Sequence, residues 1–88
     1  MLYAVKYSEE AARVRDGLPA DRRALLERGL AVLAQEPRPK ISVALSGDES
    51  TRSLALTPNI GIEYLVSDGL LLVLVVHVVD FTQVLLEE

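Results

Sequence analysis

Residues 60–79, IGIEYLVSDGLLLVLVVHVV, decide how the end of this chain folds. Two apolar segments, Ile60–Val66 and Leu70–Val79, are separated by a short polar break that contains Asp68 and Gly69. Asp-Gly is among the strongest short signals for a β-hairpin, because both central residues of a type I′ turn need a positive φ. We therefore predict an antiparallel hairpin that is closed by a two-residue loop.

A two-residue loop would place Ser67 opposite Leu70 and Glu63 opposite Leu74. Because side chains alternate along a strand, one face then has the single histidine among apolar neighbours: Ile62, Tyr64, Val66, Leu71, Val73, Val75 and His77. The other face has Gly61, Glu63, Leu65, Leu72, Leu74, Val76 and Val78. This register puts Glu63 and His77 on opposite faces. Both faces of the second strand are apolar, which predicts a central place in the sheet.

The preceding residues predict a strand, two helices and a further strand. Leu2–Tyr7 alternates as a half-buried strand does, and Ser8 can cap a helix over residues 8–16 that ends at Gly17. A second helix over residues 19–35 buries leucines at helical spacing: Leu26, Leu30 and Leu33. A strand is expected at Thr51–Leu56, whereas residues 40–50 give no clear prediction.

The composition indicates one small α+β domain that spans residues 1–88. There is no cysteine, which excludes disulfides and thiolate metal sites, and we predict neither a metal nor a cofactor. The longest uncharged apolar run, Leu70–Val79, is far shorter than the roughly 20 residues that a membrane helix needs. With no signal-peptide pattern either, we expect a cytoplasmic protein.

The charged residues are divided unevenly along the chain. All nine Lys and Arg residues lie before position 53, and residues 53–88 have five acids and no Lys or Arg. A sheet without cations is a poor surface for phosphates. The arginines of the second helix, Arg22, Arg23 and Arg28, are interspersed with Asp21 and Glu27 and are interpreted as a solvated face rather than a nucleic-acid site.

Two ionisable residues of the hairpin are candidates for chemistry. His77 could act as a general base, but the predicted register favours a core or strand-end histidine. Glu63 lies among leucines, so its carboxylate must be paired, be protonated or lie at an edge that water can reach. Pairing with an arginine of a partner is favoured over a general-acid role.

The order and spacing of several short motifs resemble the RelE/ParE superfamily of bacterial toxins over nearly the whole chain. These motifs are Tyr3-x-Val5-x-Tyr7, Ala11-Ala12, Leu18-Pro19, Leu45-x-Gly47, Arg52-x-Leu54, Tyr64-x-Val66-x-Asp68 and the strand that ends in His77. The resemblance implies an N-terminal strand, a helical hairpin and a three-stranded antiparallel meander. The helices would cover one face of a four-stranded sheet, and the active site of the ribosome-dependent mRNA endonucleases would lie on the other.

The chain departs from the catalytic pattern of that family. The arginines expected before the hairpin tyrosine and after the strand-end histidine fall at Gly61 and Val78. The C-terminal tyrosine is matched by Phe81, which lacks the hydroxyl. The remaining candidates for a catalytic set are Arg52, Glu63 and His77.

In place of the missing arginines, the hairpin has an apolar stripe with the predicted interface residues Leu65, Leu72, Leu74, Val76, Val78 and Phe81. Leaving this stripe in water would be costly. Residues 81–86, a second copy of the chain or an antitoxin-like protein could cover it. We expect a toxin-family protein that acts through protein contacts. The alternatives are an active mRNA endonuclease, which would bind the ribosome and mRNA, a ParE-like inhibitor of DNA gyrase, and an assembly module that shares only the fold.

Overall fold

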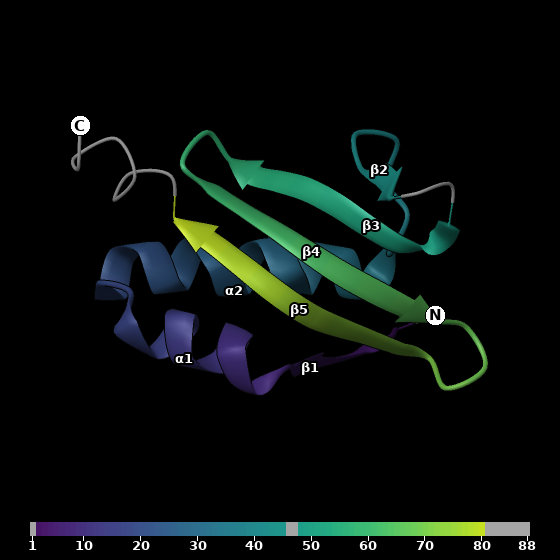
Figure 1. The fold of residues 1–88 in the computed structure, drawn as a ribbon, viewed down its shortest axis with the longest axis horizontal. Helices are drawn as coiled ribbons and strands as arrows, with labels where there is room; N and C mark the ends of the chain where they lie inside the picture. The colour runs from purple at the N-terminus through teal and green to yellow at the C-terminus, as the bar shows by residue number, and fades with distance from the viewer. Residues whose placement is uncertain (1, 46–47, 81–88) are drawn as a thin grey trace.

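The computed structural model describes residues 2–45 and 48–80 of the chain (Figure 1). Two helices follow the first strand, and the remaining strands follow the helices. The elements in chain order are β1 (Ala4–Tyr7), α1 (Glu9–Gly17), α2 (Ala20–Gln35), β2 (Val43–Leu45), β3 (Asp48–Thr57), β4 (Ile60–Ser67) and β5 (Leu72–Asp80). The α+β class and the element order that the sequence predicts are confirmed.

The strands form one sheet in the order β1-β5-β4-β3-β2, so β5 is an interior strand as its two apolar faces predict. β1 runs parallel to β5, and the other neighbouring pairs are antiparallel. The prediction of four strands is wrong by one. Val43–Leu45 adds a fifth strand, which pairs with β3 through Val43 opposite Ser53 and Ala44 opposite Arg52.

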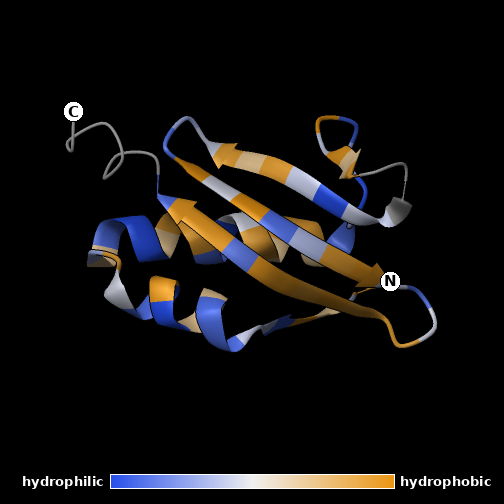
Figure 2. Cartoon of the chain, in the orientation of Figure 1, coloured by the Kyte–Doolittle hydropathy of each residue, from blue (hydrophilic) through white to orange (hydrophobic). Residues whose placement is uncertain are grey.

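α2 lies behind β4 and β5 in the view of Figure 1 and covers one face of the sheet, while α1 lies below β5 in this view and packs against the same core through Ala11. Ser8 caps α1 as predicted, since its hydroxyl oxygen accepts a 3.1 Å hydrogen bond from the Ala11 N–H. Gly17 is the last helical residue rather than the first residue beyond the helix. The predicted leucines of α2 are buried against the sheet, and β5 is apolar over most of its length (Figure 2). The core residues include Leu26, Leu30, Leu33, Tyr64, Val73 and Val75.

The hairpin between β4 and β5 forms where the sequence predicts it, but its loop is longer. Ser67 pairs with Leu72, so residues 68–71 form a four-residue connection. The positive φ of 50° belongs to Leu71. The predicted two-residue turn is therefore wrong, and every pair near the turn shifts by two residues, which leaves the assignment of faces there unchanged.

A β-bulge in β5 changes the faces further along the strand. Tyr64 pairs with Val75 and Glu63 pairs with His77, so Val76 is an extra residue. Ser8 holds this irregular backbone, because its N–H donates to the Val75 carbonyl at 2.8 Å and its hydroxyl donates to the Val76 carbonyl at 2.7 Å. A one-residue slip exchanges the two faces of a strand.

The bulge overturns two predictions. Val78 lies in the core with 7% exposure instead of on the apolar stripe. His77 lies on the face of Glu63 instead of among the core valines. Phe81, the last predicted interface residue, lies outside the described residues, as does the segment that was a candidate to cover the stripe.

Candidate functional site

The face of the sheet that the helices leave uncovered, here called the outer face, contains an open groove of about 570 Å³. β3, β4 and β5 supply its floor, the segment around β2 supplies one wall, and the start of α1 reaches the other side. Its lining includes Glu10, Ile41, Val43, Ser53, Glu63 and His77. None of the described residues that line the groove is Lys or Arg.

A polar row crosses this otherwise apolar face. Ser53 of β3 pairs with Glu63 of β4, which in turn pairs with His77 of β5. The Nε2 atom of His77 lies 3.9 Å from Oε1 of Glu63, and its Nδ1 atom lies 3.3 Å from Oε2 of Glu10. Each ring nitrogen therefore faces a carboxylate, and the contacts are ion pairs only when the imidazole is protonated. All three side chains remain partly exposed to solvent.

Small and apolar residues flank the polar row. On one side, Ala55 pairs with Gly61, which pairs with Val79. Because Gly61 has no side chain and Ala55 has only a methyl group, the floor is hollowed beside Glu63. Ile41 and Val43 in the wall are 75% and 61% exposed. The groove thus combines carboxylates with aliphatic surface that the described chain leaves in water.

The predicted apolar stripe occupies the other side of the polar row. Leu65 pairs with Leu74 and is 38% exposed, whereas Leu72, Leu74 and Val76 are partly buried. With Val78 in the core, the stripe is shorter than the sequence predicts and ends at the bulge.

Arg52 lies on the helix-covered face, opposite to the groove. Its side chain is buried with 8% exposure, and its Nε–H donates to Ser42 Oγ at 2.8 Å. A second donor of the guanidinium reaches the Ser42 carbonyl at 3.3 Å. Arg52 therefore fastens the segment between α2 and β2. The expectation that Glu63 and His77 lie apart is wrong, and Arg52 is the member of the candidate set that the sheet separates from them.

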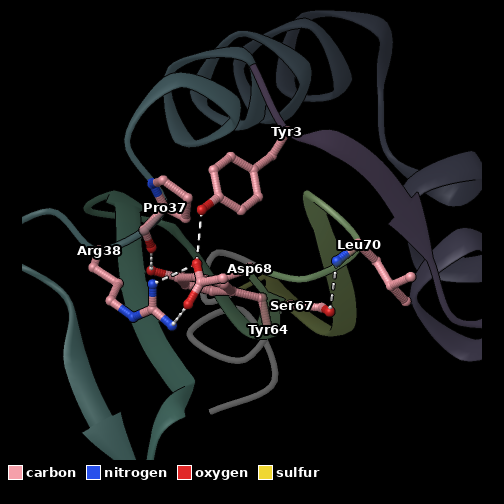
Figure 3. A network of polar contacts seen from close by, with 7 residues as sticks. All are labelled: Tyr3, Pro37, Arg38, Tyr64, Ser67, Asp68 and Leu70. Atoms are coloured by element: carbon pink, nitrogen blue, oxygen red, sulfur yellow. Dashed lines mark hydrogen bonds and ion pairs between the residues drawn. The ribbon is translucent and has the colours of Figure 1, made fainter. Parts of the chain in front are cut away.

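The hairpin tip carries a polar network that the sequence analysis did not predict (Figure 3). Arg38 donates to both oxygens of Asp68 at 3.0 and 3.1 Å, and the Tyr3 hydroxyl donates to Asp68 Oδ1 at 2.7 Å. The Arg38 hydrogen bonds, followed by that from Tyr3, hold the pKa of the Asp68 carboxyl below its ordinary value. The same Asp68 hydrogen bond raises the pKa of Tyr3. Next to it, the Tyr64 hydroxyl donates to the Pro37 carbonyl at 2.8 Å.

The arginines of α2 are less solvated than predicted. Arg22 forms a 2.7 Å ion pair with Asp80 at the end of β5, so it joins α2 to the sheet. Arg23 lies partly buried, and one of its donors reaches the Leu18 carbonyl at 3.5 Å. Only Arg28 of the three is exposed as expected.

Within residues 2–45 and 48–80, no group of three or more His, Asp or Glu side chains is arranged to hold a metal ion. Over the same residues, no helix has the length and apolar character that crossing a membrane requires.

Comparison with known proteins gives a match at the level of structure alone. No protein-family model and no curated protein sequence matches the chain. The RelBE2 toxin–antitoxin complex of Mycobacterium tuberculosis contains a chain with a TM-score of 0.75 and 22% identity, covering 91% of this chain and 99% of that one. The isolated E. coli RelE toxin gives a TM-score of 0.76 at 18% identity and covers 97% of each chain.

A YoeB/ParE toxin from Agrobacterium tumefaciens is similar too, with a TM-score of 0.71, 14% identity and coverage of 88% of this chain and 96% of that one. The chain therefore has the RelE-like toxin fold. The predicted resemblance to RelE/ParE proteins is confirmed for the fold.

Proposed function

We propose that this chain is a toxin-family protein of a toxin–antitoxin type system that acts through protein contacts on its outer face and does not cleave RNA. The observation that supports this most directly is the groove without Lys or Arg among its described lining residues. Cleavage of a phosphodiester needs cations aimed at the charge that develops in the transition state. In this chain the only arginine of β3, Arg52, is buried on the other face of the sheet.

The proposed partner is an antitoxin-like protein. Solved structures with this fold include the intact E. coli RelBE toxin–antitoxin complex and an archaeal RelE–RelB complex from Pyrococcus horikoshii. In the present chain, Leu65, Ile41 and Val43 leave aliphatic surface exposed on the same face as the groove. Surface of this kind is typical of a binding site for another protein.

The experiment combines growth and cleavage assays. The chain is expressed alone in bacteria, and the purified protein is added to ribosomes that carry a defined mRNA, with an active RelE-type nuclease as positive control. We expect normal growth and intact mRNA. Ribosome-dependent cuts in the mRNA would contradict the proposal. Co-expression with the product of the adjacent reading frame then tests for a stable complex.

One observation favours a second function, that of an active mRNA endonuclease with an unusual residue set. The imidazole of His77 between Glu10 and Glu63 could move protons as a general acid or base. If cleavage is seen, His77→Ala should abolish it while leaving the unfolding transition of the protein unchanged. A ParE-like inhibitor of gyrase needs no such set, and a DNA supercoiling assay with purified gyrase tests that alternative.

A further inference from the structure

We propose that the outer groove binds a cationic segment of a partner protein, in which a Lys or Arg side chain is flanked by aliphatic residues. This inference rests on the proposed function, because it takes the outer face as a protein-binding surface. It adds the chemistry of the bound segment. Glu63 and Glu10 would receive the cation, and Ile41 and Val43 would contact its aliphatic neighbours.

The carboxylates of the groove carry the first part of this inference. Glu63 stands on the sheet floor, and the ion-pair partner that the described residues offer it is His77 at 3.9 Å, beyond hydrogen-bonding distance. A half-buried carboxylate gains from a charge-assisted hydrogen bond, and a guanidinium can supply two such bonds at once. The floor of the groove beside Glu63 is built from residues 53–79, which contain no Lys or Arg, so the floor cannot supply this cation.

The shape of the groove carries the second part. The row formed by Ala55, Gly61 and Val79 leaves space beside Glu63, and the exposed side chains of Ile41 and Val43 border it. Lys and Arg have long aliphatic stems that lie along apolar surface while the charged end reaches a polar group. A cationic side chain flanked by aliphatic residues therefore matches both the carboxylates and the walls.

Charge decides against the other occupants of such a groove. A second copy of the chain packed through the same face would bring two identical grooves together, and neither groove has a Lys or Arg in its described lining to pair with the Glu10 and Glu63 carboxylates of the other. A nucleic acid would bring phosphates to the same carboxylates. With a net charge of −4, the chain as a whole favours a basic partner.

The test uses synthetic peptides as probes and the full-length protein. An acetylated Ser-Val-Leu-Arg-Val-Leu-Ser amide is compared with peptides that have citrulline or Glu in place of Arg, by titration followed in amide NMR spectra. We expect the Arg peptide to bind about fivefold more tightly than the citrulline peptide, with shifts at Ala55, Gly61 and Val79. This preference should shrink as the ionic strength rises.

Variants of the protein locate the site. Glu63→Gln and Glu10→Gln should each remove most of the preference for Arg over citrulline. Glu9→Gln is the matched control, because Glu9 precedes Glu10 in the first turn of α1 and does not line the groove. Glu63→Lys should reverse the preference towards the Glu peptide. Far-ultraviolet circular dichroism shows whether each variant is folded.

Three results would overturn the inference: equal binding of the Arg and citrulline peptides, a loss of preference in Glu9→Gln as large as in Glu63→Gln, or a stable homodimer whose interface covers the groove. The outcome is separable from that of the proposed function. Peptide discrimination together with ribosomal mRNA cleavage would leave this inference standing and refute the proposed function. Intact mRNA together with equal binding of the Arg and citrulline peptides would refute this inference and leave the proposed function standing.

Discussion

Arg38 holds both carboxylate oxygens of Asp68 at 3.0 and 3.1 Å, although the two residues are 30 positions apart in the chain. The pair joins the segment after α2 to the loop between β4 and β5. The hydroxyl of Tyr3, the residue before β1, donates a hydrogen bond to the same carboxylate. Three distant segments thus meet at one exposed acid (Figure 3). Asp68 of the four-residue loop is therefore bound by two residues from outside the hairpin.

The Asp68 network makes stability depend on pH in the acidic range. The hydrogen bonds from Arg38 and then Tyr3 lower the pKa of Asp68 from its ordinary value of 3.8. A lowered folded-state pKa gives stability that is present above the unfolded value and is lost as the pH falls through the folded value. Asp68→Asn should therefore lower the Tm at neutral pH, and its difference from the wild type should vanish in strong acid. Thermal unfolding measured at several pH values checks this, and a difference that is constant with pH would contradict it.

The burial of Arg52 predicts a structural role. Arg52→Met should lower the free energy of unfolding by about 1–3 kcal/mol, because the Ser42 hydroxyl and carbonyl lose a buried donor. Arg28→Met on the exposed side of α2 is the control, with an expected change within about 0.5 kcal/mol. Urea unfolding measures both variants. If Arg52→Met were as stable as the wild type but removed an RNA-cleaving activity, Arg52 would be catalytic instead.

The bulge at Val76 predicts that truncating two neighbouring valines lowers the free energy of unfolding by different amounts. Val78→Ala removes core volume and should cost about 2 kcal/mol of unfolding free energy. Val79 is 37% exposed on the outer face, and Val79→Ala should cost clearly less, about 0.5 kcal/mol. Chemical denaturation of the two variants side by side decides the register. The reverse order of costs would restore the face assignment of the uninterrupted strand.

The contact of Gly29 with Leu56 predicts a coupled pair. A Cβ at Gly29 of α2 would lie 2.9 Å from Leu56 Cδ2, so α2 and β3 approach closely at this point. Gly29→Ala gains about 1 kcal/mol of helix propensity but must displace the Leu56 side chain, and we expect these effects to offset each other. In a Leu56→Ala background the same substitution should stabilise the protein by about 1 kcal/mol. A double-mutant cycle by urea unfolding measures the coupling, and strictly additive effects would disprove the contact.

Part of the candidate site could be predicted from the sequence. The alternation of β4 correctly places Glu63 and Leu65 on the outer face, and the lack of Lys and Arg after position 52 shows that β4 and β5 bring no such cation to it. The meeting of Glu63 with His77 could not be predicted, because it depends on one extra residue in β5. Glu10 was missed as well, since in the sequence it is only a favourable residue in the first turn of a helix.

The sequence by itself determined the order of the elements other than β2, the helix cap at Ser8, the interior place of β5 and the position of the hairpin. These features follow from local preferences and from the period of apolar residues, which act within a few positions of the chain. The tertiary structure alone decided the four-residue loop and the bulge. In the loop, Asp68 binds Tyr3 and Arg38, and at the bulge Ser8 donates hydrogen bonds to the Val75 and Val76 carbonyls. Partners so distant in sequence leave no local pattern, yet a slip of one residue exchanges the faces of a strand, and that slip brought His77 to Glu63.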